Sequence, residues 1–392
     1  MQPIRPGATL GILGGGQLGR MTALAARSLG YSVHALDPDP TCPARGVVDR
    51  LVTAGFDDSE AAADLAAGCD VVTLEIEKIA IASLEAAARR APLRPAASVL
   101  EVVQDRARQK AWLASHGFPL GAFRAARSAA ELEEAVRRLG GACVAKAVIG
   151  GYDGRSQVPV PHPSAARAAW DALGGGPCIV ERLLALEREI SVLVARRPGG
   201  ESVVYPPALN HHADRILDWS VMPAPVAPEL AARAGDLGRR IAEALDVEGL
   251  LAVEMFVVEG DLLVNELAPR PHNSFHHTEV ACVTSQFEQV VRAVCDLPLG
   301  SVEVLRPAAL VNLLGDLWLG ARPPAFEEVL KLPGVKLFLY GKQEARPGRK
   351  MGHLCAIGAD PEQAVARARA ARQRLAEGAA KSARHARESV GL

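Results

Sequence analysis

Short apolar runs and Ala/Leu-rich stretches alternate along the first quarter of the chain. Residues 9–13, 31–36 and 70–74 have the length and side chains of buried strands, and a helical pattern separates the first two runs. Strands that alternate with helices are typical of a parallel sheet, because each strand must return through a crossover. The pattern therefore predicts an α/β unit with a parallel sheet over residues 1–97.

The pattern changes after this unit. The expected elements are helices at 98–117 and 128–139 and strands at 142–147, 176–181, 189–195, 251–258 and 262–267. Helix pairs beside largely antiparallel strands indicate an α+β unit, which we expect to span 98–302. A third unit, 303–392, begins with a strand near 308–314 and ends in an Ala/Arg-rich helical tail. The expected fold class is thus α/β combined with α+β, in three domains.

Two glutamates occupy mirror positions in the strand pair at 251–267. If the turn centres on Gly260, Glu254 and Glu266 lie opposite each other and point to the same face. Their expected companions on that face are apolar: Ala252, Phe256, Val258, Leu262 and Val264. Opposed like charges destabilise a ladder, and a divalent cation such as Mg²⁺ resolves the conflict. A register slip by one residue, or neutralisation by a nearby arginine, is the simpler alternative.

The segment after Glu266 carries polar donors close to this pair. Arg270, His272 and Asn273 follow within seven residues and supply cationic and amide groups. The sequence therefore places a candidate anion site beside the candidate metal site.

A glycine-rich turn follows the first strand. Gly14, Gly16 and Gly19 match the dinucleotide fingerprint of a Rossmann-like domain, and Asp37 lies near the position of a ribose-binding acid. A helix N-terminus binds any phosphate, however, so Gln17 and Leu18 at the helix start could equally hold a ribonucleotide phosphate. A nicotinamide-dependent dehydrogenase thus remains open at this point.

Lys146 lies on the strand at 142–147, directly before the glycine-rich segment 150–154. A lysine on a buried strand, followed by a loop with free backbone donors, is typical of a phosphate site. A surface lysine on an edge strand is the alternative. No GxxxxGK[ST] sequence is present, which excludes a P-loop. Glu181 and Glu189, at neighbouring strand ends, could serve an adenine edge and a ribose, or could be solvated charges.

Two further groups have structural alternatives. His211 and His212 are adjacent, so at most one of them faces inward on a strand, and a structural role is favoured for both. The basic run from Arg346 to Lys350 contains a Pro-Gly turn; it could recognise a phosphate or lie on the solvated surface.

Composition narrows the class of protein. The net charge of −1 provides no global field for nucleic acid or an anionic membrane. The seven cysteines form no CxxC pair, which favours a reducing compartment over a disulfide framework or a structural zinc site. The sequence runs almost at once into a strand and a glycine-rich turn, so we expect no signal peptide, and no apolar run approaches the length needed to span a bilayer. We therefore expect a cytoplasmic protein that binds neither nucleic acid nor membranes.

Taken together, the motifs resemble those of the ATP-grasp enzymes, and closely those of the N5-carboxyaminoimidazole ribonucleotide synthase family of purine biosynthesis. The resemblance spans about residues 8–355. It is carried by GILGGGQLGRM at 11–21, EIE at 75–77, QDRARQK at 104–110, GGYDGR at 150–155, EREISV at 187–192, NELAPRPHNS at 265–274, SQFEQ at 285–289 and RPGRKMGH at 346–353. It implies a Rossmann-like domain, a central ATP-grasp domain and a small C-terminal domain, assembled as a homodimer.

The resemblance also implies a role for each matching residue. ATP would be bound by Arg106, Lys146, Glu181, Glu189 and Asn265, and Mg²⁺ by Glu254 and Glu266. Bicarbonate would be held by Arg270, His272 and Asn273. Aminoimidazole ribonucleotide would be surrounded by Gln17, Leu18, Glu75, Tyr152, Asp153, Arg155, Lys342 and Arg349. The catalytic groups would be Lys146, Arg270 and Asp153, the last of which would orient the substrate amine.

The chain departs from the family pattern in a few places. Val148 and Ile149 replace arginines, Ser156 replaces a glycine, and Phe275 replaces a glycine next to the implied bicarbonate site, where it could alter access. A sibling ATP-grasp ligase that joins formate to glycinamide ribonucleotide remains an alternative, as do a non-catalytic homologue and, more distantly, the dehydrogenase.

Overall fold

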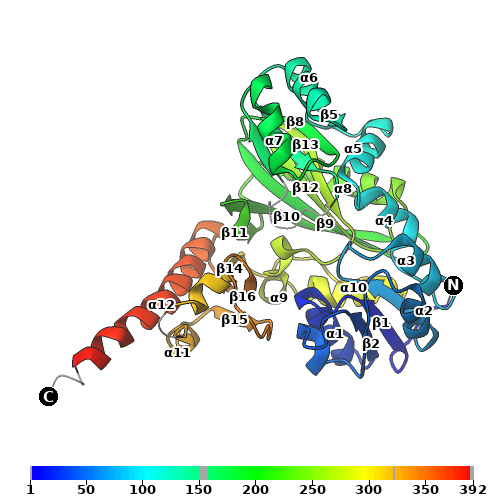
Figure 1. Ribbon diagram of the computed structural model, residues 1–392. Helices are drawn as coiled ribbons and strands as arrows, with labels where there is room; N and C mark the ends of the chain where they lie inside the picture. Colours follow the sequence, from blue (N-terminus) through cyan, green and yellow to red (C-terminus); the bar gives the residue numbers. More distant parts are fainter. Residues whose placement is uncertain (1, 150–156, 321–322, 389–392) are drawn as a thin grey trace.

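The computed structural model describes residues 2–149, 157–320 and 323–388. Three sheets organise this part of the chain (Figure 1): a four-stranded sheet in the N-terminal region, a second four-stranded sheet in a small lobe, and an eight-stranded sheet between and beyond them. The tertiary structure thus combines a parallel sheet with antiparallel ones, as the sequence predicts.

The N-terminal sheet is entirely parallel, which confirms the predicted α/β unit. Its strands, in the order β3-β2-β1-β4, are β1 (Thr9–Leu13), β2 (Ser32–Asp37), β3 (Arg50–Thr53) and β4 (Val71–Leu74). The helices of this unit are α1 (Gln17–Ser28), α2 (Ser59–Ala67) and α3 (Ile81–Ala88). The carboxyl ends of β1 and β4 lie side by side, so the glycine turn after β1 meets the EIE segment after β4.

The small lobe is antiparallel and has its own apolar core. Its strands are β5 (Phe123–Ala126), β6 (Cys143–Ala147), β7 (Gln157–Val160) and β8 (Cys178–Arg182), and its main helices are α6 (Ala129–Leu139) and α7 (Ala166–Ala172). The lobe stands at the top of Figure 1, above the large sheet. Strands β6 and β8 are neighbours, and this places Lys146 and Glu181 close together.

The large sheet is continuous across the expected boundary between the second and third domains. Its order is β13-β12-β9-β10-β11-β14-β16-β15. The strands are β9 (Arg188–Arg196), β10 (Ser202–Ala213), β11 (Ile216–Met222), β12 (Gly249–Val258), β13 (Asp261–Ala268), β14 (Ala308–Leu314), β15 (Val335–Leu339) and β16 (Lys350–Ile357). Because β11 pairs with β14, the third region completes the sheet of the second instead of forming one of its own. The limits 97/98 and 302/303 stay predictions.

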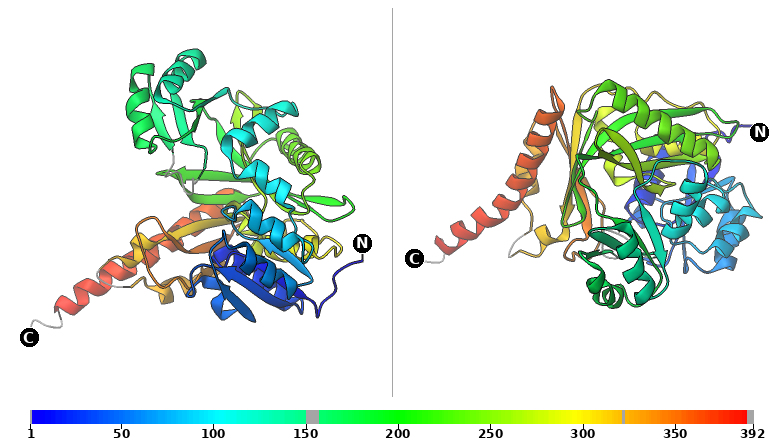
Figure 2. Two further views of the ribbon diagram at one scale, coloured as in Figure 1. Left: turned by 45° about the vertical axis from the view of Figure 1, so that its right-hand side comes forward. Right: turned by 90° about the horizontal axis from the view of Figure 1, so that it is seen from above.

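Several helices cover this sheet or join it to its neighbours. They are α4 (Ala97–Val103), α5 (Arg106–Ser115), α8 (Pro228–Ala244), α9 (Thr278–Ala281), α10 (Gln286–Val294), α11 (Phe326–Leu330) and α12 (Pro361–Glu388). The start of α12 packs on β14 and β16 through Ala364, Ala368, Ala371 and Leu375, and the helix then extends away from the body of the molecule (Figures 1 and 2). No helix in the described residues is both long and apolar enough to cross a membrane.

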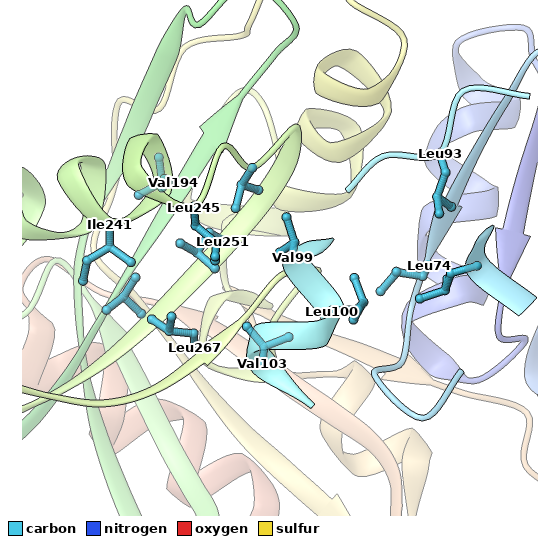
Figure 3. Packing of buried hydrophobic residues seen from close by; sticks show 14 of the residues in the cluster. Leu74, Leu93, Val99, Leu100, Val103, Val194, Ile241, Leu245, Leu251 and Leu267 are labelled. Atoms are coloured by element: carbon cyan, nitrogen blue, oxygen red, sulfur yellow. The ribbon is translucent and has the colours of Figure 1, made fainter. Parts of the chain in front are cut away.

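The N-terminal sheet and the large sheet share one apolar core. Figure 3 shows Val99, Leu100 and Val103 of α4 between Leu74 and Leu93 on one side and Leu251 and Leu267 on the other, and all seven belong to one buried cluster. Leu74 comes from the N-terminal unit and Leu251 from the large sheet, and both are almost fully buried. This shared core fixes the N-terminal unit against the hairpin that carries the two glutamates.

Candidate active site

Glu254 and Glu266 are direct partners across the ladder of β12 and β13, as the sequence predicts. The turn holds two residues, Glu259 and Gly260, with positive φ values of 52° and 76°, the geometry of a tight hairpin turn. A two-residue turn alone would offset the glutamates by one position. The register shifts by one residue at Asn265, and this bulge brings the carboxylates opposite each other.

The bulge also overturns one expectation about this face. Leu262 and Val264 were expected beside the glutamates, but they pair with Val257 and Met255 and are buried with them in the opposite, apolar core. The expectation assumed an uninterrupted alternation along β13, which the extra residue breaks. Phe256 does lie on the face of Glu254 and lines the same cavity.

A cavity of about 430 Å³ opens in front of this hairpin. Side chains from all three regions of the chain line it: Gln17, Leu18, Arg106, Lys146, Gln157, Glu189, Asn210, His212, Arg215, Leu217, Glu254, Phe256, Asn265, Glu266, Leu267, Ala268, Arg270, His272, Asn273, Ser274 and Lys350. Most of the residues implied to bind ATP, Mg²⁺ and bicarbonate therefore meet at one place.

A second cavity of about 140 Å³ adjoins the first and shares Lys146 and Phe256 with it. It lies between the small lobe and the large sheet, beside the segment that follows β8. Apolar groups from Val144, Leu183, Leu184 and Leu186 form much of its lining. A small, largely apolar cavity with a few polar groups in its wall is the kind of site that holds a nucleotide base.

Glu181 lines the smaller cavity and forms ion pairs with two lysines, of which Lys146 lines both cavities. Its carboxylate lies 2.6 Å from Lys146 Nζ and 3.0 Å from Lys110 Nζ. Burial alone would raise the pKa of Glu181, but the two lysines outweigh burial and hold it below its usual range. Burial lowers the pKa of Lys110 in spite of its partner. Lys110 also donates to the carbonyl of Val264 at 3.2 Å, which ties α5 to the hairpin.

The surroundings of Glu254 fit a divalent cation. Burial first, and the charge of Glu266 second, raise the pKa of Glu254. Its carboxylate lies 3.3 Å from Nε2 of His272 and accepts from Nδ2 of Asn265 at 3.3 Å. Burial, and then the charge of Arg270, lower the pKa of His272 far below its usual range, so both neighbours are uncharged at neutral pH. A cation bound between Glu254 and Glu266 would favour the ionised form of both carboxylates.

The composition of the site favours Mg²⁺ over a closed metal cage. Within the described ranges, no group of three or more His, Cys, Asp or Glu side chains is arranged to hold a metal by itself. Two carboxylates with phosphate and water as the other ligands are typical of Mg²⁺. Arg106 places a positive group beside Glu266, with Nη2 3.8 Å from Glu266 Oε1.

The segment after β13, the candidate anion site, has unmet hydrogen-bonding capacity. Both amide atoms of Asn273, Oδ1 and Nδ2, are buried and have no hydrogen-bond partner among the described residues. Buried polar atoms normally have a partner, so this pair of donor and acceptor points to a ligand. The segment is held in place by Gln286, which accepts from the His272 amide at 2.8 Å and donates to its carbonyl at 3.0 Å.

Phe275 does not restrict this anion site. Its side chain is fully buried beneath the sheet, with its ring centroid 6.4 Å from that of Tyr205, and it is absent from the cavity lining. The expectation that it alters access is therefore not supported. The phenyl ring fills core volume below the segment instead.

The glycine turn after β1 is occupied by the protein's own carboxylates. The amide of Gly15 donates to Asp37 at 2.7 Å, and those of Gly16 and Gly19 donate to the two oxygens of Glu75 at 2.8 and 2.9 Å. A Cβ atom at Gly16 would come within 2.5 Å of Glu75. The donors that a dinucleotide pyrophosphate would need are thus already used, and Asp37 is not available for a ribose. This geometry argues against the dehydrogenase alternative.

Burial raises the pKa of Glu75 to about 7, although the two amide hydrogen bonds partly oppose this effect. Glu75 lies beneath the start of α1 and is only 8% exposed, whereas Gln17 and Leu18 line the larger cavity above it. Of these three expected substrate residues, the structure therefore brings two to the cavity wall and one behind it.

Two other expected substrate residues, Lys342 and Arg349, are not among the residues that line the larger cavity. Lys342 donates to the carbonyl of Lys350 at 2.7 Å, and Arg349 donates to that of Glu344 at 2.7 Å. Thr41 holds the pKa of Asp39 below its usual range, and the nearby charge of Arg349 adds to this effect. The basic loop therefore approaches the N-terminal unit. Tyr152, Asp153 and Arg155 lie outside the described residues.

Three cavity residues were missed or set aside at the level of the sequence. His212 lies 2.6 Å from Glu189 and faces the larger cavity, whereas His211 stacks on Trp219 outside it. Strand alternation predicts that only one histidine faces inward, but not which one. Lys350 lines the cavity although its side chain is mostly buried. Lys110 could have been found, because it follows Arg106 by four residues on one face of α5.

A small antiparallel lobe and a larger antiparallel sheet that grip a nucleotide-sized cavity define an ATP-grasp protein. Family models agree: the ATP-grasp domain matches residues 111–287, the ribonucleotide synthetase preATP-grasp domain matches 7–104, and the phosphoribosylaminoimidazole carboxylase C-terminal domain matches 308–367.

Known proteins identify the family more narrowly. The chain is 42% identical to the N5-carboxyaminoimidazole ribonucleotide synthase of Bacillus subtilis, over 90% of this chain and 92% of the relative, and 39% identical to that of Brucella melitensis, over 90% and 97%. A solved N5-carboxyaminoimidazole ribonucleotide synthetase in complex with ADP superposes with a TM-score of 0.90 at 40% identity, covering 95% of this chain and 98% of that one. The chain belongs to the N5-carboxyaminoimidazole ribonucleotide synthase family.

Proposed function

We propose that the chain forms N5-carboxyaminoimidazole ribonucleotide from 5-aminoimidazole ribonucleotide, bicarbonate and ATP, and that the γ-phosphoryl group of ATP passes first to bicarbonate. One observation carries the chemical part of this proposal: the unmatched amide of Asn273 lies beside Arg270 and His272, at the end of the strand that carries Glu266. The Aspergillus clavatus relative, 32% identical with a TM-score of 0.87 over 94% of this chain and 98% of that one, was crystallised with ADP and aminoimidazole ribonucleotide.

ATP would span the two adjoining cavities. The smaller cavity would take the adenine between the leucines after β8 and Phe256, and Glu189 with His212 would face the ribose. Lys146, beside Asn265 at 3.4 Å, would then contact the phosphates from one side and Arg106 from the other. The ion pairs of Glu181 hold Lys146 at the junction of the two cavities, where the chain of phosphates must pass.

Glu254 and Glu266 would hold Mg²⁺, with the phosphates of ATP as further ligands. The ion would neutralise charge on the transferring phosphoryl group. Asn265, which the bulge turns toward the same cavity, would keep the Glu254 carboxylate oriented. These residues fit the ion because two carboxylates face each other across the ladder, and carboxylate oxygens are ligands that Mg²⁺ prefers.

Bicarbonate would be bound by Arg270, His272 and Asn273. An oxygen of bicarbonate attacks the γ-phosphorus, the bond to the β-phosphate oxygen breaks, and ADP leaves; the product is carboxyphosphate. Arg270 stabilises the charge that develops on the oxygens, and Asn273 can donate to one bicarbonate oxygen and accept from its hydroxyl. Burial keeps His272 neutral, so it can accept or donate a hydrogen bond without adding charge.

The exocyclic amine of aminoimidazole ribonucleotide then attacks the carboxyl carbon. The C–O bond to phosphate breaks, phosphate leaves, and the nitrogen loses a proton, which gives the N-carboxy product. The ribonucleotide would lie against Gln17 and Leu18 at the start of α1, with its phosphate near Lys342 and Arg349. Asp153 remains our candidate for orienting the amine, and Glu75, Tyr152 and Arg155 complete the proposed substrate set.

A homodimer in the cytoplasm is part of the same proposal. The dimer rests on the family pattern. The compartment rests on cysteine usage, since all seven cysteines of the chain are free thiols.

The test is ADP formation by the purified protein with each substrate omitted in turn. ADP formation should require aminoimidazole ribonucleotide and should fall to the background rate in CO₂-depleted buffer, then recover when bicarbonate is added. Formate with glycinamide ribonucleotide should not support turnover. ADP formation that ignores bicarbonate, or that depends on formate, would exclude the proposed reaction.

A further inference from the structure

Arg270 forms an ion pair with a residue of the N-terminal unit. Its Nε lies 2.7 Å from Oε1 of Glu77, and both side chains are largely shielded, with exposures of 13% and 24%. One terminal nitrogen, Nη1, donates to the carbonyl of Pro271 at 3.1 Å. The hydrogen bond from Nη1 and the ion pair at Nε, which lacks the geometry of a hydrogen bond, together restrict where the guanidinium can lie.

Glu77 is itself anchored on both sides. The side-chain amide of Gln104 donates to the carbonyls of Glu77 and Ile79, at 2.7 and 2.6 Å. Two residues earlier, Glu75 binds the amides at the start of α1. The EIE segment therefore cannot drift without loss of these contacts, and it carries the Glu77 carboxylate to a defined place between the glycine turn and the segment that follows β13.

We propose that Glu77 is a positioning residue: it orients the Arg270 guanidinium for bicarbonate and links that site to the domain that takes the ribonucleotide. The inference rests on the proposed role of Arg270. An arginine held only by bicarbonate would lose side-chain entropy on each binding event, whereas one already fixed by Glu77 does not. Carboxylate and bicarbonate then occupy different edges of the same planar cation.

Two competing roles for Glu77 predict different results. If its carboxylate merely fills the bicarbonate position while that position is empty, its removal should improve bicarbonate binding. If the ion pair is only an interdomain clamp, its removal should lower stability without selecting one substrate.

The chain offers a matched control. Arg94, of the N-terminal unit, pairs with Glu248 of the large sheet region at 2.9 Å, with side-chain exposures of 4% and 29%. This pair also joins the two regions, but neither residue lines either cavity. Glu248→Gln therefore reports what the loss of one interdomain ion pair does to the fold alone.

The experiment compares Glu77→Gln, Glu77→Asp, Glu248→Gln and Arg270→Lys in the full chain. KM is measured for bicarbonate, ATP and aminoimidazole ribonucleotide, together with the thermal midpoint of unfolding. Glu77→Gln should raise the bicarbonate KM about tenfold, with the ATP KM changed less than about twofold. Glu77→Asp, which keeps the charge, should recover part of the loss. Glu248→Gln should lower the thermal midpoint of unfolding about as much as Glu77→Gln does, and it should leave all three KM values unchanged.

The outcomes separate the inference from the proposed function. A bicarbonate KM that Glu77→Gln lowers or leaves unchanged, while Arg270→Lys raises it, overturns the positioning role and keeps the bicarbonate site. If Arg270→Lys itself leaves the bicarbonate KM unchanged, the assignment of the site is wrong, and the role of Glu77 falls with it. Equal changes in all three KM values for Glu77→Gln, matched by Glu248→Gln, would reduce Glu77 to a structural clamp.

Discussion

Glu254 and Glu266 face each other across an antiparallel ladder because Asn265 bulges out of β13 between them and the turn. The same bulge turns the Asn265 amide toward Glu254, so one extra residue sets both the opposition of the carboxylates and the donor that orients one of them. Bulges beside active sites commonly re-aim side chains in this way. The relationship makes the hairpin the centre of the proposed site, with the proposed nucleotide contacts on one side and the proposed anion site on the other.

The first prediction concerns the stability of the metal-free hairpin. Burial and the charge of Glu266 raise the pKa of Glu254, so protonation of this carboxyl group stabilises the fold. This contribution is fully present below pH 4.5, the usual pKa of the group, and is lost as the pH rises through the raised pKa. At pH 8 and without metal, the thermal midpoint of unfolding of Glu254→Gln should therefore be no lower than that of the wild type. It should also lose the gain in thermal midpoint that Mg²⁺ with ADP gives the wild type.

Asp261→Asn is the control for this prediction. Asp261 belongs to the same hairpin but pairs at the surface with Arg233 and is 77% exposed. This variant should keep the stabilisation by Mg²⁺ with ADP. Retention of the full shift by Glu254→Gln would remove Glu254 from the metal site.

Lys110→Met should lower the free energy of unfolding and also weaken the binding of ATP. The change leaves the buried Glu181 carboxylate with a single lysine and the Val264 carbonyl without this donor, which should lower the free energy of unfolding by about 2 kcal/mol. It should raise KM for ATP and leave KM for the ribonucleotide unchanged, as measured by initial rates. Lys331→Met, which removes a surface pair with Glu328, should do neither.

Arg349→Ala should raise KM for aminoimidazole ribonucleotide about tenfold, because one charge-assisted contact to a phosphate is removed. KM for ATP should stay close to its wild-type value. Arg346→Ala, three residues earlier, removes a residue whose ion pair with Glu344 is 65% and 62% exposed, and it should leave both constants unchanged. Parallel increases for both substrates in Arg349→Ala would move the ribonucleotide phosphate elsewhere.

Buried histidines should make the fold sensitive to acid. Burial lowers the pKa of His277 and His353 to about 3. Their contribution to stability is therefore present above pH 6.5 and is lost as pH falls toward 3, because the unfolded chain takes up protons that the folded chain does not. His353→Gln, which keeps a polar partner near Tyr340, should reduce the pH dependence of the unfolding free energy by about 1.4 kcal/mol per pH unit between pH 6 and 4. Denaturant titrations at several pH values measure this slope, and an unchanged slope would show that His353 is protonated in the folded state.

The sequence predicted the parts of the molecule that depend on local pattern. The parallel N-terminal sheet and the largely antiparallel strands of the middle region follow from periodicity and turn residues. The glutamates lie opposite each other as predicted, but they do so through a bulge at Asn265 that the pattern did not predict. The faces of Leu262 and Val264 were predicted wrongly, because a bulge leaves no mark in the alternation until both strands are aligned. The inward direction of His212 was undecided for the same reason, since the register between β10 and β11 shifts between His211 and His212.

Contacts between distant segments could not be predicted without the fold. Glu75 is 59 residues from Gly16, and nothing in either segment indicates that its carboxylate binds that amide. The glycine turn therefore looks like a dinucleotide site in the sequence, although its donors are used internally. The pair between Glu77 and Arg270 likewise depends on packing between two regions, which no local pattern records.

The most direct test is a crystal structure of the protein with Mg²⁺ and a non-hydrolysable ATP analogue. Carboxylate oxygens of both Glu254 and Glu266 should bind the ion, and the terminal phosphates should lie between that ion, Lys146 and Arg106. A nucleotide bound with both carboxylates directed away from the ion, or an ion bound elsewhere in the cavity, would contradict the central place of this hairpin in catalysis.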